Sequence, residues 1–344
     1  MVANVMKSFL GQLRVGEPVE VQNLTLVPLL GGHDEPPQYL TLDEALDAGT
    51  LGVTEVTNDG HVPELAVENT GEKPVLLLDG EELVGAKQNR ILNLTVLVPG
   101  ETKLVIHVSC VEQGRWRSMS THFQAGHYSP ARLRSNKERS VRESLRTMGA
   151  PVSDQGQVWD DVSETLCFSR AESPTMAMAD AYSKMESDLR KAAEGISLPD
   201  DTCGLAAFVV DAMIVVDLFG YQATFRQVRP KLIDSYLIAA LSELSVRTDR
   251  VISPDGFDFR KRTAETLERA AAGQVEQRQT IGLGNDVRIT GESIRGAALV
   301  GGEDVLHVSL FPDDGEDIGR TMGGSRMASP RIRRRRTRGT PRED

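Results

Sequence analysis

The chain has 344 residues, with 39 Lys and Arg against 50 Asp and Glu, and a formal net charge of −11. The charge is divided unevenly, because residues 320–344 hold nine Arg and two acidic residues, or +7, which leaves −18 for residues 1–319. An acidic body argues against a compact nucleic-acid-binding domain, whose basic surface would be built into the fold.

Membrane insertion and a disulfide framework are not expected either. No apolar run approaches the roughly 20 residues that cross a bilayer. Residues 1–18 lack the continuous apolar block of a signal peptide. Three cysteines in this length do not make a disulfide-rich protein. We therefore expect a soluble, cytoplasmic, globular protein.

The first third of the chain, residues 15–118, is expected to be rich in β-strands. Apolar runs recur about every ten residues between Gly, Asn and Asp turns, which is typical of an antiparallel sandwich or open barrel. The expected strands are 20–30, 51–56, 65–68, 75–78, 91–98 and 104–111. One helix is predicted at 41–48, because Thr41 and Glu44 form a capping-box pattern.

The middle of the chain, residues 129–195, is predicted to be helical. In segment 129–148, apolar and basic residues recur at helical spacing on two different sides. The apolar side holds Leu133, Val141, Leu145 and Met148, and the basic side holds Arg132, Arg139, Arg142 and Arg146. Further helices are expected at 158–166 and at 173–194, where Ser173 suits the cap and Pro174 the first turn.

The last third, residues 203–312, returns to strands. Segments 205–210 and 213–219 form a predicted hairpin, and helices are expected at 230–245 and 256–275. Short strands are expected at 286–290, 296–300 and 305–310. From residue 313 on, acidic, Gly-rich and then Arg-rich composition predicts a disordered basic tail. The pattern predicts an α+β protein with helices inserted between two groups of antiparallel strands, and one domain over residues 15–312.

The densest group of polar residues lies in segment 78–93, LDGEELVGAKQNRILN. Three carboxylates that face a Lys and an Arg across a short connection can hold each other's pKa values apart, as acid–base catalysis requires. The candidate catalytic residues are Asp79, Glu81 and Glu82, and the candidate ligand-binding residues are Lys87, Gln88, Asn89 and Arg90.

Other interpretations of segment 78–93 stay open. Opposite charges on a hairpin also pair across strands without any further role. The three carboxylates are compatible with a magnesium ion, although no feature of the sequence requires a cofactor. A zinc site is not expected, because the chain has no HExxH and no CxxC pattern. It also lacks the P-loop and GxSxG motifs.

A second candidate group follows strand 104–111. Alternation places Cys110 and Glu112 on one face of this strand, and both are taken as candidate catalytic residues. Trp116, between Arg115 and Arg117, offers a stacking surface beside two anion-binding groups. A lone cysteine in a strand is, however, more often a small buried hydrophobic residue than a nucleophile.

Two basic segments each have a structural and a functional interpretation. The arginine side of segment 129–148 is either a solvated helix surface or a surface that closes over a phosphate-bearing ligand. Residues 331–338 hold six Arg. They form either an unstructured end that affects solubility or a contact for nucleic acid or an acidic partner.

Five segments in order resemble the ARG-and-rhodanese-phosphatase-superfamily-associated protein domain. They are PVLLLDGEELVGAKQNRILNLTVLVPG at 74–100, HVSCVEQGRW at 107–116, DQGQVWDDV at 154–162, AAFVVDAMIVVDLFG at 206–220 and KLIDSYLIAAL at 231–241. The resemblance extends from about residue 15 to residue 311 and depends on the order of the segments. That family takes its name from ADP-ribosylglycohydrolases and rhodanese/phosphatase-superfamily proteins.

The resemblance implies a place in the handling of NAD-derived nucleotides, ADP-ribose or ADP-ribosylated molecules, but no particular reaction. Within the matching segments, the resemblance directs attention to twelve residues without assigning a role to any of them. They are Asp79, Gly80, Glu81, Lys87, Gln88, Asn89, Arg90, Cys110, Glu112, Trp116, Gln155 and Trp159. Gln155 joins the candidate ligand-binding residues on this ground.

Two hypotheses about function follow. The first is an enzyme that acts on an NAD-derived nucleotide or ADP-ribose, with Glu81 or Glu82 as general acid/base and Trp116 stacking on a base or sugar. Lys87 and Arg90 would stabilise negative charge. The second is a non-catalytic binding or adaptor module that works with ADP-ribosylglycohydrolase or phosphatase proteins. Neither hypothesis includes a membrane, and nucleic acid enters only through the basic tail.

Overall fold

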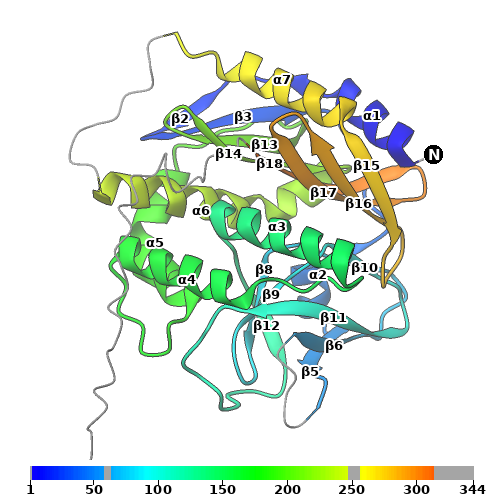
Figure 1. The fold of residues 1–344 in the computed structure, drawn as a ribbon, viewed down its shortest axis with the longest axis vertical. Coiled ribbons are helices and arrows are strands. Elements are labelled where there is room, and N and C mark those ends of the chain that lie inside the picture. Colours follow the sequence, from blue (N-terminus) through cyan, green and yellow to red (C-terminus); the bar gives the residue numbers. More distant parts are fainter. Residues whose placement is uncertain (1, 58–62, 247–255, 314–344) are drawn as a thin grey trace, which may run out of the picture.

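The computed structural model describes residues 2–57, 63–246 and 256–313. These residues form seven helices and eighteen strands, and the strands belong to three largely antiparallel sheets. Figure 1 shows the largest sheet in the upper half, the two smaller sheets in the lower half, and helices between and beside them. The predicted α+β class, with helices inserted between groups of antiparallel strands, is confirmed.

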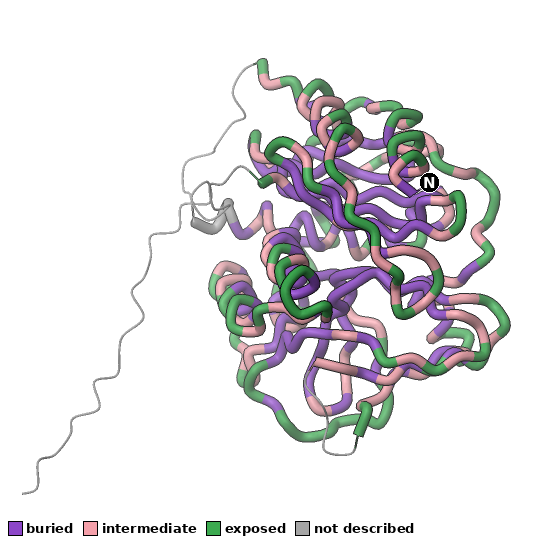
Figure 2. The backbone as a smooth tube through the Cα atoms, turned by 45° about the vertical axis from the view of Figure 1, so that its right-hand side comes forward, coloured by how far each residue is buried: buried purple, intermediate pink, exposed green. Residues whose placement is uncertain are grey.

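The largest sheet has nine strands. Its order is β1 (Arg14–Val15), β3 (Leu24–Leu30), β13 (Thr202–Val209), β14 (Ala212–Phe219), β18 (Asp304–Pro312), β17 (Ile294–Gly301), β16 (Asn285–Gly291) and β15 (Gln274–Gln279), with β2 (Val19–Val21) on β3. Helices α1 (Val2–Gln12) and α7 (Phe259–Ala272) cover one face, and α6 (Gln222–Val246) packs on the other. The central strands are therefore buried along most of their length (Figure 2).

The second sheet has six strands and curves into a half-barrel. Its order is β12 (Phe123–Tyr128), β8 (Glu81–Gly85), β9 (Arg90–Leu92), β11 (Thr102–Cys110), β6 (Glu64–Asn69) and β5 (Leu51–Glu55). The outer strands β12 and β5 contact each other, and apolar side chains such as Leu83, Ile106 and Val108 fill the inner face.

A small three-stranded sheet accompanies the half-barrel. It consists of β10 (Val96–Val98), β7 (Val75–Leu77) and β4 (Leu40–Thr41), in which β4 runs parallel to β7. Helix α2 (Leu42–Asp47) follows β4 and begins at the predicted capping box of Thr41 and Glu44. This pattern was therefore a reliable sign of a helix start.

The remaining helices form a layer against the two large sheets. Helices α4 (Gln155–Ser169), α5 (Met178–Ala193) and α6 pack on one another, and α3 (Ala131–Thr147) packs on α4 and α6. Helix α3 also contacts β14 of the nine-stranded sheet. Of the helices in the described part of the chain, none is long and apolar enough to cross a membrane.

The predicted strand 91–98 is wrong as a single element. The chain bends at residues 93–94, and β9 then pairs with β11 whereas β10 pairs with β7. Polar contacts hold the bend, since the Asn93 side chain donates to the carbonyl of Pro151 and the Asp79 N–H donates to Thr95. A continuous apolar run does not reveal that its two halves serve different sheets.

Helices α5, α6 and α7 also start or end at other residues than predicted. Helix α5 begins at Met178 rather than at Ser173, because the Ser173 hydroxyl accepts from the Ala177 N–H and closes a separate turn. Helix α6 begins at Gln222 and contains Pro230, which is exposed. Helix α7 ends at Ala272, so the expected helix 256–275 runs into strand β15.

The basic side of α3 does not face open solvent as one surface. Arg142 pairs with Glu138 and donates to the carbonyls of Ile289 and Gly296 at 2.9 and 2.6 Å. Arg132 pairs with Asp161 and Glu164. Arg132 and Arg142 therefore stabilise the fold, whereas the side chains of Arg139 and Arg146 are 55% and 66% exposed and fit the solvated-surface interpretation. Met148, expected inside, is 68% exposed. The Arg-rich segment 331–338 lies outside the described residues.

Candidate functional site

One end of the six-stranded sheet gathers most of the candidate ligand-binding residues. Neighbouring strands are antiparallel, so the end of β8, the start of β9 and the end of β11 lie at the same edge. Arg90 is opposite Leu83 on one side and Cys110 on the other. Because paired residues project to the same face, Arg90 and Cys110 point toward the inner face with Leu83.

Arg90 is fully buried, and most of its hydrogen-bonding capacity is unused. Its Nη1 donates to Oε1 of Gln88 at 3.1 Å. Its Nε and Nη2 have no hydrogen-bond partner among the described residues. These two nitrogens form the edge of the guanidinium group that binds a carboxylate or phosphate with two parallel hydrogen bonds. Burial lowers the pKa of Arg90, as expected for a charge that has lost its water.

An aromatic ring and a second cation accompany Arg90. The guanidinium carbon of Arg90 lies 5.9 Å from the centre of the Trp116 ring, and Nζ of Lys87 lies 5.5 Å from it. Trp116 is 49% exposed, although it is one of the largest side chains in the protein. A half-exposed indole near two cations offers a flat surface on which a second ring can stack.

Gln88, Cys110 and Gln155 hold this arrangement in place. Oε1 of Gln88 accepts from both Arg90 and Sγ of Cys110, the latter at 3.2 Å. The amide of Gln155, at the start of α4, bonds both the N–H and the carbonyl of Cys110 at 2.8 Å. Burial raises the pKa of Cys110 to about 11, so it is a neutral thiol near pH 7. We name Lys87, Gln88, Arg90, Cys110 and Trp116 the Arg90 cluster.

Glu112 adjoins the Arg90 cluster, but its carboxylate oxygens already accept hydrogen bonds from residues outside the cluster. Arg115 donates to both of its oxygens, at 2.8 and 2.6 Å, and Thr175 and the Asn89 N–H donate to it at 2.8 and 3.1 Å. Although burial opposes it, these bonds lower the pKa of Glu112. Arg115, expected to hold an anion, is itself buried and also donates to the Ala86 carbonyl. This pair stabilises the loop after β11.

Glu82 projects to the other face of the same sheet. It is paired with Ile91, whereas Leu83 is paired with Arg90, so strand alternation separates the two charges. Its carboxylate accepts from the His127 N–H at 3.2 Å and from Asn89 at 3.4 Å. Burial raises the pKa of Glu82 to about 7. We expected this carboxylate to face Lys87 and Arg90, and that prediction is wrong.

Glu81 and Asp79 also lie apart from the Arg90 cluster. Glu81 accepts the Leu78 N–H at 2.8 Å, and burial raises its pKa to about 7 despite the nearby charge of Lys231. Asp79 forms a buried ion pair with Lys137 of α3. The acid–base roles of Asp79, Glu81 and Glu82 stay predictions, but these carboxylates do not face the cations that the sequence placed with them.

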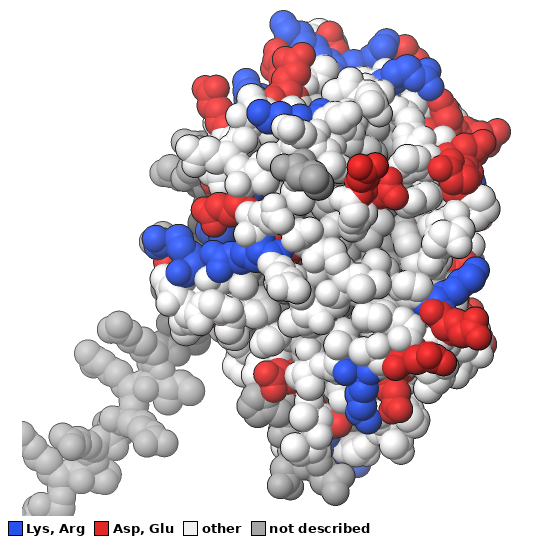
Figure 3. All heavy atoms as spheres, turned by 90° about the vertical axis from the view of Figure 1, so that its right-hand side faces the viewer, with Lys and Arg blue, Asp and Glu red and all other residues white. Residues whose placement is uncertain are grey.

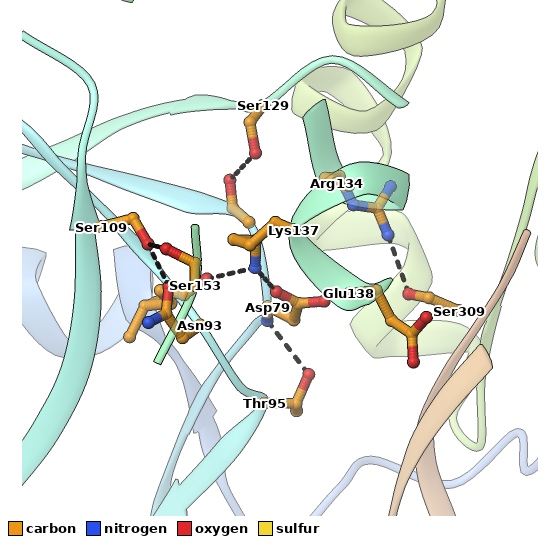
Figure 4. Close-up of polar contacts among 12 residues, drawn as sticks. Asp79, Asn93, Thr95, Ser109, Ser129, Arg134, Lys137, Glu138, Ser153 and Ser309 are labelled. Carbon is orange, nitrogen blue, oxygen red and sulfur yellow. Dashed lines mark hydrogen bonds and ion pairs between the residues drawn. The ribbon is translucent and has the colours of Figure 1, made fainter. Parts of the chain in front are cut away.

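Helix α3 carries buried charges that the sequence did not single out (Figure 4). Lys137 reaches Asp79 and the Leu92 carbonyl in the lower sheets. Arg134 binds both carboxylate oxygens of Asp217 in the nine-stranded sheet, at 2.8 and 2.5 Å, and donates to Ser309 at 2.8 Å. This α3 cluster joins the two halves of the molecule. Its residues recur at helical spacing with the buried Val141, which is the signal that a sequence reader could have used.

Glu55, at the end of β5, is a further residue that sequence reasoning missed. It continues the inward alternation of Leu51 and Val53, both buried, and its main neighbour is the backbone of Lys87. An acidic residue at an inward position of an alternating strand was the available signal. No group of three or more His, Cys, Asp or Glu suited to a metal ion occurs in residues 2–57, 63–246 or 256–313.

One face of the molecule carries charges of both signs (Figure 3). On the face of the described chain seen in Figure 3, acidic and basic side chains alternate around the edge of a broad uncharged area. Such a surface gives no general attraction for a phosphate polymer, so anion binding depends on a local arrangement.

Comparison with known proteins identifies one family. The family model described as the ARG and Rhodanese-Phosphatase-superfamily-associated Protein domain matches residues 12–311. No curated protein and no solved structure matches the chain. The matched span includes every candidate residue described above.

Proposed function

The chain belongs to the family of ARG and Rhodanese-Phosphatase-superfamily-associated Protein domains, and we propose that it binds a phosphorylated nucleotide derived from NAD, such as ADP-ribose, at the Arg90 cluster. The family name links the domain to ARG and rhodanese-phosphatase-superfamily proteins. It names no ligand, so the ligand class is argued from the side chains.

The free edge of the Arg90 guanidinium group is the observation that carries this proposal. A buried donor without a partner destabilises a protein, and a buried charge without a counter-ion does so more strongly. Arg90 has two such donors, and among the ion pairs of the described residues none involves its guanidinium group. A phosphate group placed against Nε and Nη2 would satisfy both donors and supply the counter-ion.

Lys87 and Trp116 favour a nucleotide over a simple anion as the proposed ligand. Lys87 adds a second positive charge beside the same ring. The exposed indole of Trp116 suits stacking of a base, which is sequence-tolerant because every base has an aromatic face. The ends of β-barrels are also a common location for small-molecule sites.

Binding without catalysis is the form of the proposal that the geometry favours. Glu82 projects away from Arg90, Glu112 is occupied by Arg115, and Cys110 is a neutral thiol. The enzyme remains a second candidate because burial holds Glu81 and Glu82 at pKa values of about 7, which suits general acid–base catalysis near neutral pH. A reaction that used Glu82 would take place on the face of the sheet opposite Arg90.

A thermal-shift and product assay with ADP-ribose tests the proposal. A ligand at one hundred times its dissociation constant stabilises by about 2.7 kcal/mol. We expect ADP-ribose to raise the melting temperature of the wild-type protein without release of product. The variant Arg90→Met should lose the shift, whereas Arg146→Met, which removes an exposed arginine of α3, should keep it.

The assay also separates the two candidates. Product release that Glu81→Gln or Glu82→Gln abolishes would support the enzyme. The absence of any shift with ADP-ribose, AMP or inorganic phosphate would reject binding at the Arg90 cluster. Cooperation with an ADP-ribosylglycohydrolase or phosphatase protein, and a cytoplasmic location, are further proposals that rest on the family name and the composition.

A further inference from the structure

Glu55 presents an unused hydrogen-bond acceptor at the same end of the half-barrel. Strand β5 alternates, so Glu55 projects inward with Leu51 and Val53. Its Oε1 accepts the Lys87 N–H at 3.3 Å. Its Oε2 is buried and has no hydrogen-bond partner in the described part of the chain.

The unused acceptor of Glu55 complements the unused donors of Arg90. Both side chains project to the inner face at the edge where β5, β8, β9 and β11 end or begin. They are close enough for the charge of Glu55 to act on Arg90 and on Cys110. No hydrogen bond joins them, since Oε2 of Glu55 and Nε and Nη2 of Arg90 are all without partners among the described residues.

This arrangement requires a group that both accepts and donates hydrogen bonds. A phosphate oxygen satisfies Arg90 but has no proton for Glu55, and it brings a second negative charge near that carboxylate. A sugar hydroxyl beside the phosphate donates to Glu55 while the phosphate accepts from Arg90. Hydrogen bonds to ionised groups are among the stronger ones in proteins, so such a pair of contacts discriminates between ligands.

We propose that Glu55 is a specificity-determining residue that accepts a hydrogen bond from a ribose hydroxyl of the ligand whose phosphate is bound by Arg90. The inference rests on the proposed function and narrows its ligand class to ribose phosphates with free hydroxyls. A site built on this principle rejects an analogue that lacks the hydroxyl, because Glu55 is then left buried and unsatisfied.

Calorimetric titration with a charge-matched pair of nucleotides tests the inference. AMP and 2′,3′-dideoxyadenosine 5′-monophosphate share the base and the phosphate and differ only in the two ribose hydroxyls. We expect wild-type protein to bind AMP about tenfold more tightly or better. In Glu55→Leu this ratio should fall to about one, while the dideoxy nucleotide binds unchanged or more tightly because a negative charge is gone.

Glu55→Gln provides the conservative variant if Glu55→Leu does not fold. Its amide oxygen still accepts, but without charge, so the ratio should fall between the values of wild type and Glu55→Leu. Equal ratios in wild type and both variants would overturn the role of Glu55. A wild-type ratio near one would also overturn it, because the ribose hydroxyls then make no contribution and a water molecule can satisfy Glu55 instead.

The failure of the inference is distinguishable from the failure of the proposed function. If wild-type protein binds neither nucleotide, or if Arg90→Met binds both as wild type does, the proposed function is rejected and the role of Glu55 falls with it. If Arg90→Met loses both nucleotides and the Glu55 variants keep the wild-type ratio, only the role of Glu55 is rejected.

Discussion

Two buried arginines of this protein have opposite surroundings. Arg134, between the two halves of the molecule, is paired with Asp217, donates to Ser309 and has the Tyr128 ring 4.5 Å away. Arg90, at the end of the half-barrel, is equally buried, but its guanidinium group makes a single hydrogen bond within the described part of the chain, to Gln88. The aromatic ring near it, Trp116, is half exposed.

The difference separates a buried charge that has a counter-ion within the fold from one that has none among the described residues. A charge in a protein interior is retained when hydrogen bonds and a counter-ion replace its water. Arg134 has its counter-ion, Asp217, within the fold, and only its Nε is without a hydrogen-bond partner among the described residues. Its pKa is raised well above the ordinary value because, despite burial, the charge of Asp217 favours the ionised form. Arg90 has no ion-pair partner among the described residues, and our proposal is that a ligand supplies one. Substitutions at the two sites should therefore have opposite consequences.

The largest expected effect is on stability, at Arg134. Arg134→Met leaves Asp217 buried without its counter-ion, and we expect the free energy of unfolding to fall by about 3–5 kcal/mol. Chemical denaturation measures this. Arg146→Met removes an exposed arginine of the same helix and should change stability little. Equal effects of the two substitutions would contradict the assignment of Arg134 to the fold.

The next effect is a pH dependence from Glu82. Burial raises its pKa from 4.5 to about 7, so the folded protein binds a proton more tightly than the unfolded chain. This contribution to stability is complete below pH 4.5 and is lost as the pH rises through 7. Glu82→Gln should remove about 2 kcal/mol of the decline in unfolding free energy between pH 5 and pH 8.

The control for Glu82 is an exposed carboxylate on α3. The bond from Arg146 lowers the pKa of Glu143, so this group stays ionised throughout pH 5–8. Glu143→Gln should therefore leave the pH dependence unchanged. A slope that Glu82→Gln does not alter would mean that this carboxyl is hydrated in the folded protein.

Trp116 should affect binding without affecting stability. Trp116→Leu removes the stacking surface, and we expect the affinity for ADP-ribose to fall roughly tenfold. The melting temperature should change little, because half of the ring is already exposed. Met119→Leu, at a more exposed position of the same loop, serves as the matched control in the same titration. A large loss of stability in Trp116→Leu would make the ring part of the core instead.

The smallest effect is expected at Lys87. Lys87→Gln removes a partly exposed charge, so affinity should fall only a few-fold, and the loss should shrink as salt screens the charge. Titrations at low and high ionic strength measure it. Lys103→Gln, which removes an exposed lysine of β11 paired with Glu68, should change neither the affinity nor its salt dependence. A salt-independent loss would indicate a direct buried contact of Lys87 with the ligand.

The sequence predicted the parts of the fold that depend on local pattern. Alternating apolar residues located most strands, and the hairpin of β13 and β14 is confirmed in its pairing. Helix α1, β12 and β15 were not predicted. Strand β12, FQAGHY, interrupts its apolar residues with Gly126 and His127. Strand β15 is mostly charged or polar and lies at a sheet edge, so no buried face marks it.

The candidate site was predicted in part, and the misassigned residues show why. Lys87, Gln88, Arg90, Cys110, Trp116 and Gln155 do lie together. Glu82 was grouped with Arg90 because the two are near in sequence, but strand register places them on opposite faces. Strand register is set by tertiary contacts that no local sequence pattern contains. The same holds for the ion pairs of Asp79 with Lys137 and of Glu112 with Arg115.

The most direct test of the central claim is a calorimetric titration of ADP-ribose into wild-type protein and Arg90→Met, combined with unfolding of each protein without ligand. We predict that Arg90→Met binds about a hundredfold more weakly or worse, because two hydrogen bonds from a charged group are lost. Without ligand it should be at least as stable as wild type, because an incompletely bonded buried charge has been removed. Wild-type affinity together with reduced stability in Arg90→Met would contradict the account and make Arg90 a structural residue like Arg134.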